Sequence, residues 1–304
     1  MCQSLAECLN KNGPAIIAPD HLDVVCTYTI MILEKKSPPQ LDSEIPEEEN
    51  EEASEYESVL ISAASDLVGA MANVLGADFT DPLKQFMPQI MKYYTPGRSV
   101  SDRATAIGSL GEIITGMKGA ITPFTQDILS LLSRALSDEE ASVRSNAVFA
   151  SGVLIENTQA DLSAHFPALL NAIRPFFEKA QNEADEVQTA RDNACGCLSR
   201  MIIKNADAVP LDQALPILFS SLPLQKDMAE WSPVLHCMMN LIQSNNSVAS
   251  QNIDTILQLF AHVLAGDEDN LGALLRGQVC GFVSQLNTQI PDKVQAAGLQ
   301  QFLV

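Results

Sequence analysis

The sequence predicts an all-α protein in which pairs of helices stack into a superhelix. Apolar residues recur at spacings of three and four along most of the chain, as on one face of an α-helix. Alternation of apolar and polar residues, which would indicate strands, is essentially absent. The stretch DEEASVRSNA at 138–147 returns as DEVQTARDNA at 185–194, with acid, Arg, Asn and Ala in the same order. A segment that repeats in this way predicts an array of similar units.

Residues that end helices separate the apolar stripes. Pro, Gly, Asp and Asn gather at breaks such as TPG at 95–97 and AVPLD at 208–212, and such clusters mark turns. The breaks predict helices at 4–12, 20–36, 53–76, 81–94, 99–118, 123–136, 139–157, 161–179, 185–205, 211–221, 228–244, 249–265 and 270–287.

The apolar stripes of the central helices are the clearest. In the helix expected at 99–118, the residues on one face are Ile107, Leu110, Ile114 and Met117. The helices expected at 139–157 and 185–205 carry matching stripes, which are Val143, Ala147, Ala150 and Leu154 in the first and Ala190, Ala194, Cys197 and Met201 in the second. These faces are expected to form the core.

The spacing of equivalent arginines suggests the type of repeat. Arg103, Arg144 and Arg191 are 41 and 47 residues apart, close to the roughly 40–47-residue period of HEAT and armadillo arrays. One helix pair cannot bury its apolar face alone, so the pairs stack into a curved solenoid with a long concave surface. We therefore expect residues 1–304 to form a single HEAT-repeat α-α superhelix of about six to seven helix pairs, a part of a longer protein.

One segment departs from the helical pattern. Residues 37–57, SPPQLDSEIPEEENEEASEYE, contain three prolines and nine acidic residues. This composition predicts a disordered insertion between the two helices of an early repeat. A solvated linker and a contact for a basic partner both fit it.

The overall charge restricts the partners. With 38 acidic and 18 basic residues, the formal net charge is −20, which repels nucleic acid and anionic membranes and favours a basic partner. A solubilising surface charge would give the same composition. No run of about 18 apolar residues and no signal peptide is evident. Seven cysteines, an odd number, suit free thiols in a reducing compartment. The sequence therefore predicts a soluble intracellular protein.

No catalytic signature is present. The sequence lacks a phosphate-binding GxxxxGK[ST] loop, a GxGxxG turn, an HExxH helix and a GxSxG elbow. His236 beside Cys237 has no second ligand pair at a useful spacing. We expect neither an enzyme nor a bound metal or cofactor.

The repeated stretch contains residues of two kinds. Asp138 and Arg144, like Asp185 and Arg191, stand six residues apart near the start of a helix. They resemble the HEAT consensus, in which an Asp at the turn and an Arg on the next helix link neighbouring repeats. These charges are therefore expected to be structural.

The asparagines of the repeat are candidates for binding. Asn146 and Asn193 lie at the margin of the buried stripe, and one amide can both donate to and accept from a peptide backbone. Glu139 and Glu186 stand seven residues earlier on nearly the same face and could receive Lys or Arg side chains. Hydrogen bonds to the adjacent repeat would explain the asparagines equally. The polar residues between them, Ser142 and Thr189, complete this set.

Neighbouring helices extend the predicted peptide-binding stripe. The preceding helix offers Asp102, Thr105 and Glu112, and Asp192 lies beside the second asparagine. The following helix begins with Glu230 and Trp231, the only tryptophan, where a lysine could meet a carboxylate and a ring face. A buried tryptophan fits the position equally well.

Two stretches are characteristic, SVSDRATAIGSLGEII at 99–114 and VRSNAVFASGVLIENT at 143–158. With these stretches, the acidic bias and the helix pairs, the chain resembles the C-terminal part of an importin-beta (karyopherin-beta) family receptor. The resemblance implies a nuclear import carrier that shuttles between cytoplasm and nucleus. It implies basic cargo such as core histones three and four and ribosomal proteins. It also implies Ran GTPase and nucleoporins as partners of the full-length receptor. A HEAT-repeat scaffold of the phosphatase or coat type, binding a folded partner, is the alternative.

Overall fold

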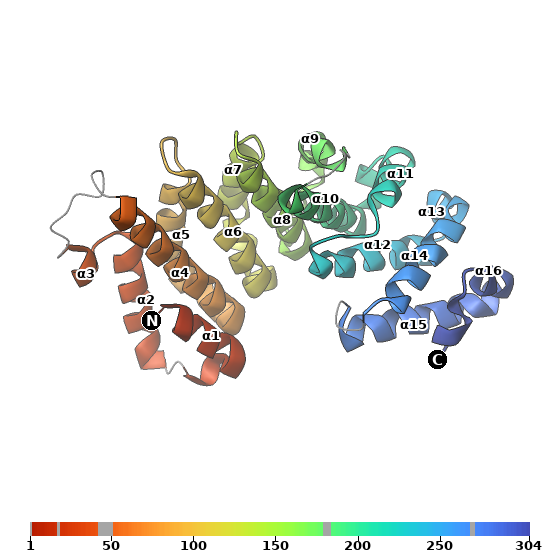
Figure 1. Cartoon of the computed structure of the whole chain (residues 1–304), viewed down its shortest axis with the longest axis horizontal. Coiled ribbons are helices and arrows are strands. Elements are labelled where there is room, and N and C mark those ends of the chain that lie inside the picture. The colour runs from red at the N-terminus through yellow and green to blue at the C-terminus, as the bar shows by residue number, and fades with distance from the viewer. Residues whose placement is uncertain (1, 17–18, 42–50, 179–183, 268–270) are drawn as a thin grey trace. The chain divides into compact units, whose positions relative to one another are not determined.

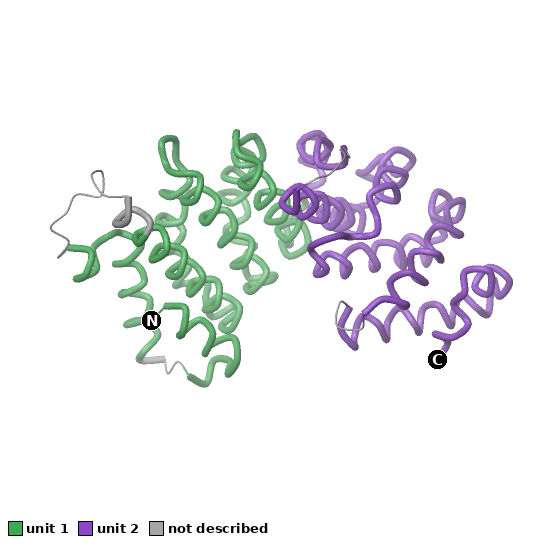
Figure 2. Tube along the Cα trace, in the orientation of Figure 1, with its two compact units in different colours: residues 1–161 green, residues 162–304 purple. Residues whose placement is uncertain are grey.

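The computed structural model describes residues 2–16, 19–41, 51–178, 184–267 and 271–304, and the regular elements among them are all helical (Figure 1). The predicted all-α fold class is confirmed. The chain divides into two compact units, residues 1–161 and 162–304 (Figure 2), and each is considered by itself. That both units continue as the single array expected over 1–304 stays a prediction.

Unit 1 has two layers of helices. The helices α1, α4, α6 and α8 lie side by side in one layer, which we call the α4 layer, and α2, α5 and α7 pack against it (Figure 1). The helices of this unit are α1 (Cys2–Asn12), α2 (Pro19–Leu33), α3 (Pro38–Leu41), α4 (Glu51–Leu75), α5 (Thr80–Tyr93), α6 (Val100–Met117), α7 (Thr125–Ala135) and α8 (Ala141–Asn157). Short 3₁₀ turns follow α1, α4 and α6, at Gly13–Ile16, Gly76–Phe79 and Lys118–Phe124.

Helix α6 shows how sequence determines this layer. The Ser99 side chain accepts a hydrogen bond of 3.0 Å from the Asp102 amide and caps the first turn. The predicted stripe on α6 is buried, with Ile107, Leu110 and Ile114 fully inaccessible. Burying a side chain of this size stabilises the fold by about 1.5–3 kcal/mol, so the central helix of the layer is firmly held between α4 and α8.

A glycine sets the separation of α4 and α6. A Cβ atom at Gly116 of α6 would lie 2.6 Å from Cα of Asn73 and 2.7 Å from the carbonyl carbon of Ala72, both in the backbone of α4. Any larger residue would push the two helices apart. The absence of a side chain therefore lets them pack at close range.

Charged residues link consecutive repeats of unit 1. Arg103 of α6 donates to both carboxylate oxygens of Asp138, at 3.1 Å each. Burial opposes ionisation of Asp138, but hydrogen bonds led by Arg103 lower its pKa. The Arg144 guanidinium donates a hydrogen bond of 2.6 Å to the backbone carbonyl of Asp138. The structural role expected for Asp138 is thus fulfilled by pairing with the preceding repeat.

The acidic insertion is shorter than expected. Residues 38–41 form α3, and α4 already begins at Glu51, so the prediction of disorder is wrong at both ends of 37–57. Acidic residues are favourable in the first turns of a helix because they complement its dipole. Glu57 accepts a hydrogen bond of 2.8 Å from Gln40, which joins the two ends. The prediction for 42–50 concerns residues outside those described.

Unit 2 contains the remaining helices. They are α9 (Phe166–Ile173), α10 (Asp185–Lys204), α11 (Leu211–Ser221), α12 (Trp231–Gln243), α13 (Ser247–Gln251), α14 (Ile253–Ala265), α15 (Gly272–Gln289) and α16 (Pro291–Ala296). The 3₁₀ turns are Ser163–His165, Arg174–Phe177, Ala206–Ala208, Met228–Glu230 and Leu299–Phe302. Within this unit α10 contacts α9, α11 and α12, and α15 contacts α12.

Two helices expected in unit 2 differ in their boundaries, and one helix was not expected. The helix expected at 161–179 shrinks to α9, which ends at Ile173 and passes into the 3₁₀ turn Arg174–Phe177, because Pro175 has no N–H to continue the α-helical hydrogen bonds. The helix expected at 249–265 is divided at Asn252 into α13 and α14, and Asn246 caps α13. No helix was expected at α16, whose Pro291 lies in the first turn, where proline is tolerated.

Helix α10 is surrounded by protein over most of its length. Every residue from Ala190 to Ile202 is buried. The predicted core residues Ala194, Cys197 and Met201 are among them, as expected. Arg191, Asp192 and Asn193 of the repeated stretch are buried as well. Two of these, Asp192 and Asn193, were expected to bind a peptide.

One described segment, Tyr56–Tyr93, is long and apolar enough to cross a membrane by length and composition. Of its apolar window, 56% is buried inside the fold, and Leu67, Val68 and Met71 of α4 belong to the core. A buried core helix meets the same two criteria, so they are weak grounds for a membrane span here.

Candidate peptide-binding pocket in unit 1

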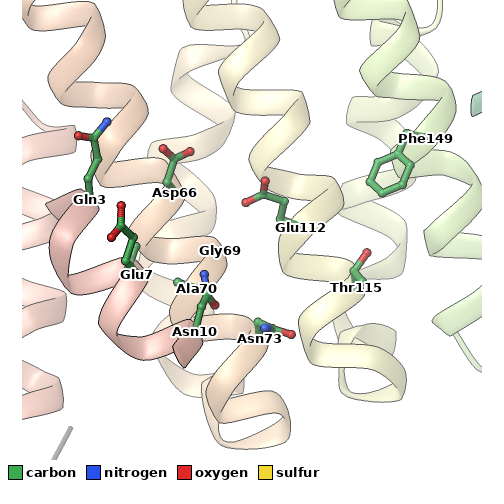
Figure 3. Close-up of a pocket in the computed structure, with 11 residues that line it drawn as sticks. Gln3, Glu7, Asn10, Asp66, Gly69, Ala70, Asn73, Glu112, Thr115 and Phe149 are labelled. Atoms are coloured by element: carbon green, nitrogen blue, oxygen red, sulfur yellow. The ribbon is translucent and has the colours of Figure 1, made fainter. Parts of the chain in front are cut away.

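A pocket of about 640 Å³ opens on the α4 layer of unit 1 (Figure 3). It is formed by side chains from α1, α4, α6 and α8, so four helices that are distant in sequence build one surface. Its lining residues are Gln3, Ala6, Glu7, Asn10, Asp66, Gly69, Ala70, Asn73, Glu112, Thr115 and Phe149.

The polar side chains of the pocket form two rows across the helices. The acid row consists of Glu7 on α1, Asp66 on α4 and Glu112 on α6. The second row consists of two amides and one hydroxyl, those of Asn10, Asn73 and Thr115, on the same three helices (Figure 3). On each helix the two residues are three or seven positions apart, spacings that place them on one face. None of the described lining residues is basic, so the pocket is strongly electronegative.

Burial in the pocket disfavours ionisation of its carboxyl groups. Burial raises the pKa of Asp66. Burial and, next, the negative charge of Asp66 raise the pKa of Glu112. Both side chains still reach solvent, so a ligand can approach them. A cation between the two would replace lost hydration and relieve their repulsion.

Several polar groups of the pocket have no partner within the described chain. Asp66, Glu112 and Asn73 make no side-chain hydrogen bond or ion pair to any described residue. Thr115 differs, because its hydroxyl donates to the Gly111 carbonyl at 2.9 Å. Both carboxylates and the Asn73 amide are therefore available to a ligand.

Small residues and one ring shape the pocket. The Glu112 carboxylate lies directly over Gly69 of α4, where any side chain would collide with it. A Cβ at Gly111 would lie 2.9 Å from two ring carbons of Phe149, so the ring lies close over α6 at one end of the pocket. The ring offers a face that attracts cations.

The structure brings only one of the predicted binding residues into this pocket, namely Glu112. Asn146 is half-buried, and its amide donates to the Ala104 carbonyl of α6 at 2.9 Å. It serves the contact between repeats, the alternative that the sequence left open. Thr105 is half-buried, and Asp102 pairs with Arg98 at 3.6 Å.

Two further predicted residues of unit 1 lie at the start of α8, outside the pocket. Ser142 is exposed, and the Glu139 side chain is 82% exposed and lies 3.5 Å from Arg103. They are accessible to a partner, but the contact with Arg103 already neutralises part of the Glu139 charge.

Four predicted binding residues of unit 2 are buried, and for these the structure corrects the prediction. Asn193 is 5% exposed, Asp192 1%, Glu230 0% and Trp231 4%. Asp192 accepts three backbone N–H groups, from Gln225, Lys226 and Asp227. Its carboxylate holds the loop before α12 and faces no solvent.

Glu230 and Trp231 have a structural role as well. Glu230 pairs with Arg200 of α10, and its carboxylate occupies the space left by the missing side chain of Gly196. Trp231 packs in the core at the start of α12. The predicted meeting of a lysine with this acid and ring is therefore wrong, because neither side chain is accessible. Glu186 is exposed, and Thr189 is half-buried and donates to the Asp185 carbonyl.

The sequence contained a signal for the residues that were missed. Asp66 and Asn73 are an acid and an asparagine seven residues apart, the same spacing as Glu139 and Asn146. In α4 both members of the pair are exposed. Comparison of this spacing across all the helices would have identified α4, although it lies outside the duplicated stretch.

Metal binding and thiol chemistry concern other side chains in the part of the chain that the structure describes. Among the described residues, no group of three or more His, Cys, Asp or Glu side chains could hold a metal ion. Cys197 and Cys237 are buried, and burial raises the pKa of each thiol to about 12. A thiol with such a pKa is a poor nucleophile.

The acid row predicts an unusual effect of mutation on stability. The double substitution Asp66→Asn and Glu112→Gln is expected to leave the Tm at neutral pH unchanged or to raise it by roughly 1–3 °C. Because folding raises both pKa values, the folded protein loses stability as pH rises through them. The difference between variant and wild type should therefore disappear below about pH 4. Calorimetry across this pH range provides the measurement, and a lower Tm for the variant at neutral pH would contradict the expectation.

Comparison with known proteins agrees with the architecture. The family model for HEAT repeats of the type described as "Stalled ribosome sensor GCN1-like" matches residues 60–222. The chain is 37% identical over 279 residues to "Probable importin subunit beta-4" of Schizosaccharomyces pombe. It is 29% identical over 283 residues to "Importin-4" of Homo sapiens.

These alignments cover 89% and 92% of this chain but 26% and 25% of the two relatives. The chain thus spans about a quarter of their length. The resemblance seen in the sequence is confirmed. The chain belongs to the HEAT-repeat family, and its helix pairs are a HEAT-repeat region of the importin-beta type.

Proposed function

We propose that the chain is a cargo-binding segment of a nuclear transport receptor and that the pocket of unit 1 holds a lysine-rich, extended segment of the cargo. The observation that carries the proposal is the acid row, in which Glu7, Asp66 and Glu112 line one pocket without a basic residue. The importin relatives support the transport role.

The two rows are proposed to bind different parts of the peptide. Lysine ammonium groups approach the acid row, where a charge-assisted hydrogen bond is about twice as strong as a neutral one. The amides of Asn10 and Asn73 can donate to and accept from the peptide backbone, whatever its side chains. Exposed ion pairs contribute only about 0–1 kcal/mol each, so affinity arises from several contacts made at once.

The resemblance to importins suggests the partners. Core histones three and four and ribosomal proteins supply lysine-rich extended segments, and we propose them as cargo. Ran GTPase and nucleoporins would be partners of the full-length receptor, which shuttles between cytoplasm and nucleus. Accessible residues of unit 1 outside the pocket, namely Asp102, Thr105, Ser142 and Glu139, would extend the contact with a longer segment. Glu186 and Thr189 of unit 2 stay a separate proposed contact.

Removal of two pocket charges tests the proposal. The double variant Asp66→Asn and Glu112→Gln is expected to bind a fluorescent lysine-rich peptide roughly tenfold more weakly, since two ion pairs and their mutual reinforcement are lost. Fluorescence anisotropy at low and physiological salt gives the affinities. Binding by wild type should weaken as salt rises, and acetylation of the peptide should weaken it as well.

A matched variant separates the pocket from overall charge. Asp78→Asn with Asp127→Asn removes two exposed carboxylates of unit 1 that do not line the pocket, and it should bind as wild type does. Equal losses in both double variants would mean that net charge alone attracts the peptide. Unchanged affinity in the pocket variant, together with retained binding of a folded partner, would favour the scaffold alternative.

A further inference from the structure

We propose that the Glu112 carboxylate of the pocket binds a lysine ammonium group, which takes the place that an arginine of the chain itself holds on a carboxylate of unit 2. This inference rests on the proposed function, because it names the group of the cargo that the same pocket would bind. It follows from two sites, one in each unit, in which a carboxylate lies over a glycine of the neighbouring helix.

In unit 2 the carboxylate and its cation are both present. Helices α10 and α12 pack against each other. Glu230 precedes α12 and extends over Gly196 of α10, where a Cβ atom would collide with its carboxylate. Arg200 follows Gly196 by one turn of the same helix and pairs with Glu230. Its Nη1 would lie 2.8 Å from that Cβ atom. The space left by the glycine thus holds a carboxylate with its own guanidinium.

In unit 1 the carboxylate is present without such a cation. Helices α4 and α6 pack against each other, and Glu112 of α6 extends over Gly69 of α4. The three atoms nearest to a Cβ atom at Gly69 all belong to Glu112, with its Cβ at 3.3 Å and its Cδ at 3.6 Å. The residue four positions after Gly69, which corresponds to Arg200, is the uncharged Asn73. None of the described lining residues of the pocket is basic, so the matching cation has to come from a ligand.

Two further differences open the site of unit 1 to a ligand. Glu230 is 0% exposed, whereas Glu112 reaches solvent in the pocket. Three residues before the glycine, unit 2 has Asn193 and unit 1 has Asp66, which places a second acid on the same helix face. Burial and, after it, the charge of Asp66 raise the pKa of Glu112. An ammonium group has three donors and no acceptor, which suits a place among negative charges.

Gly69 is the positioning residue of this site, and its replacement by alanine is the first test. Gly69→Ala retains every charge but displaces the Glu112 carboxylate from α4. The affinity for a fluorescent lysine-rich peptide is expected to fall roughly fivefold. The Tm should not fall, because alanine is a better helix former than glycine. Gly277→Ala makes the same change inside α15, where the added Cβ meets open space, and should bind as wild type does.

Asn73→Arg gives unit 1 the cation that unit 2 already has, and it provides an independent test should Gly69→Ala lower the Tm. The new guanidinium should pair with Glu112 as Arg200 pairs with Glu230. Peptide affinity should then fall roughly tenfold, and the pKa of Glu112, followed by NMR titration of its carboxyl carbon, should fall as well. Gln126→Arg adds the same charge at an exposed position of α7 and should leave both values as in wild type.

The outcomes separate this inference from the proposed function. Wild-type affinity in Gly69→Ala would overturn the inference. So would an unchanged Glu112 pKa in Asn73→Arg, because the added cation would not reach the carboxylate. A lowered pKa with wild-type affinity would also overturn it, since the peptide would not need Glu112. In each case the proposed function stands as long as the Asp66→Asn, Glu112→Gln variant binds the peptide more weakly. If that variant binds as wild type does, both fail.

Discussion

Replacement of Glu230 by Gln is expected to lower the free energy of unfolding of unit 2 by about 3–5 kcal/mol. Glu230 and Arg200 form an ion pair in which the two side chains are 0% and 8% exposed. Gln has nearly the same shape but no charge, so the variant removes the carboxylate that pairs with the buried guanidinium. Loss of one partner from a buried pair typically has a cost of this size.

Trp231 makes this effect measurable in unit 2 alone. It is the only tryptophan of the chain, it is 4% exposed, and it follows Glu230 directly. Its fluorescence during urea unfolding therefore reports the region around the pair. Glu186→Gln makes the same chemical change at an exposed position of α10 and should leave the midpoint unchanged. Equal midpoints for wild type and Glu230→Gln would contradict the structural role assigned to Glu230.

Substitution of Asp192 by Ala should destabilise unit 2 by about 3 kcal/mol or more. Its Oδ2 accepts the backbone amides of Gln225, Lys226 and Asp227 at 2.9, 2.6 and 2.9 Å. Hydrogen bonds to a charged group contribute about 1.5–3 kcal/mol each and are not additive. Removal of the carboxylate leaves three donors to be satisfied by water, so the loop that leads into α12 should loosen.

Two further variants test why the Asp192→Ala substitution would destabilise unit 2. Asp192→Asn retains an acceptor oxygen without the charge, so its loss of stability should be intermediate if hydrogen bonding is the cause. Asp212→Ala removes an exposed carboxylate on α11 and controls for the change in charge. Hydrogen exchange of the amides at 225–227 should accelerate in Asp192→Ala. Protection equal to that of wild type would show that the carboxylate does not hold the loop.

Both variants of unit 2 also bear on function. Glu230 looked like a peptide contact in the sequence because it stands beside Trp231 at the start of a helix, and Asp192 because it lies beside Asn193. The structure gives each a buried partner, so neither substitution should change the affinity for a lysine-rich peptide while the protein remains folded. The carboxylates proposed to bind, Asp66 and Glu112, should show the opposite behaviour, with weaker binding and no loss of stability.

The residue types of the candidate site could be predicted from the sequence, but the helix that carries them could not. The sequence suggested that acids and asparagines seven residues apart would face a basic peptide. That pattern occurs within α4 and α10 and at the start of α8, where Glu139 precedes the helix. In α10 the asparagine, Asn193, is buried, and in α8 Asn146 bonds to the neighbouring helix. Only in α4 are both members, Asp66 and Asn73, exposed and available. Spacing defines which side chains share a face, but it does not reveal what covers that face.

The sequence by itself determined the fold class, the positions of most helices and the residues of the central core. These properties depend on local periodicity and on helix-ending residues, which act within a few positions along the chain. Tertiary structure alone decided which polar residues are accessible. Glu230 is buried because Gly196 leaves space for it and Arg200 neutralises it. Glu112 joins Asp66 and Glu7 in a pocket because three helices distant in sequence lie side by side. Accessibility and pocket formation depend on contacts between distant segments, and the sequence of one helix does not show which other helices pack against it.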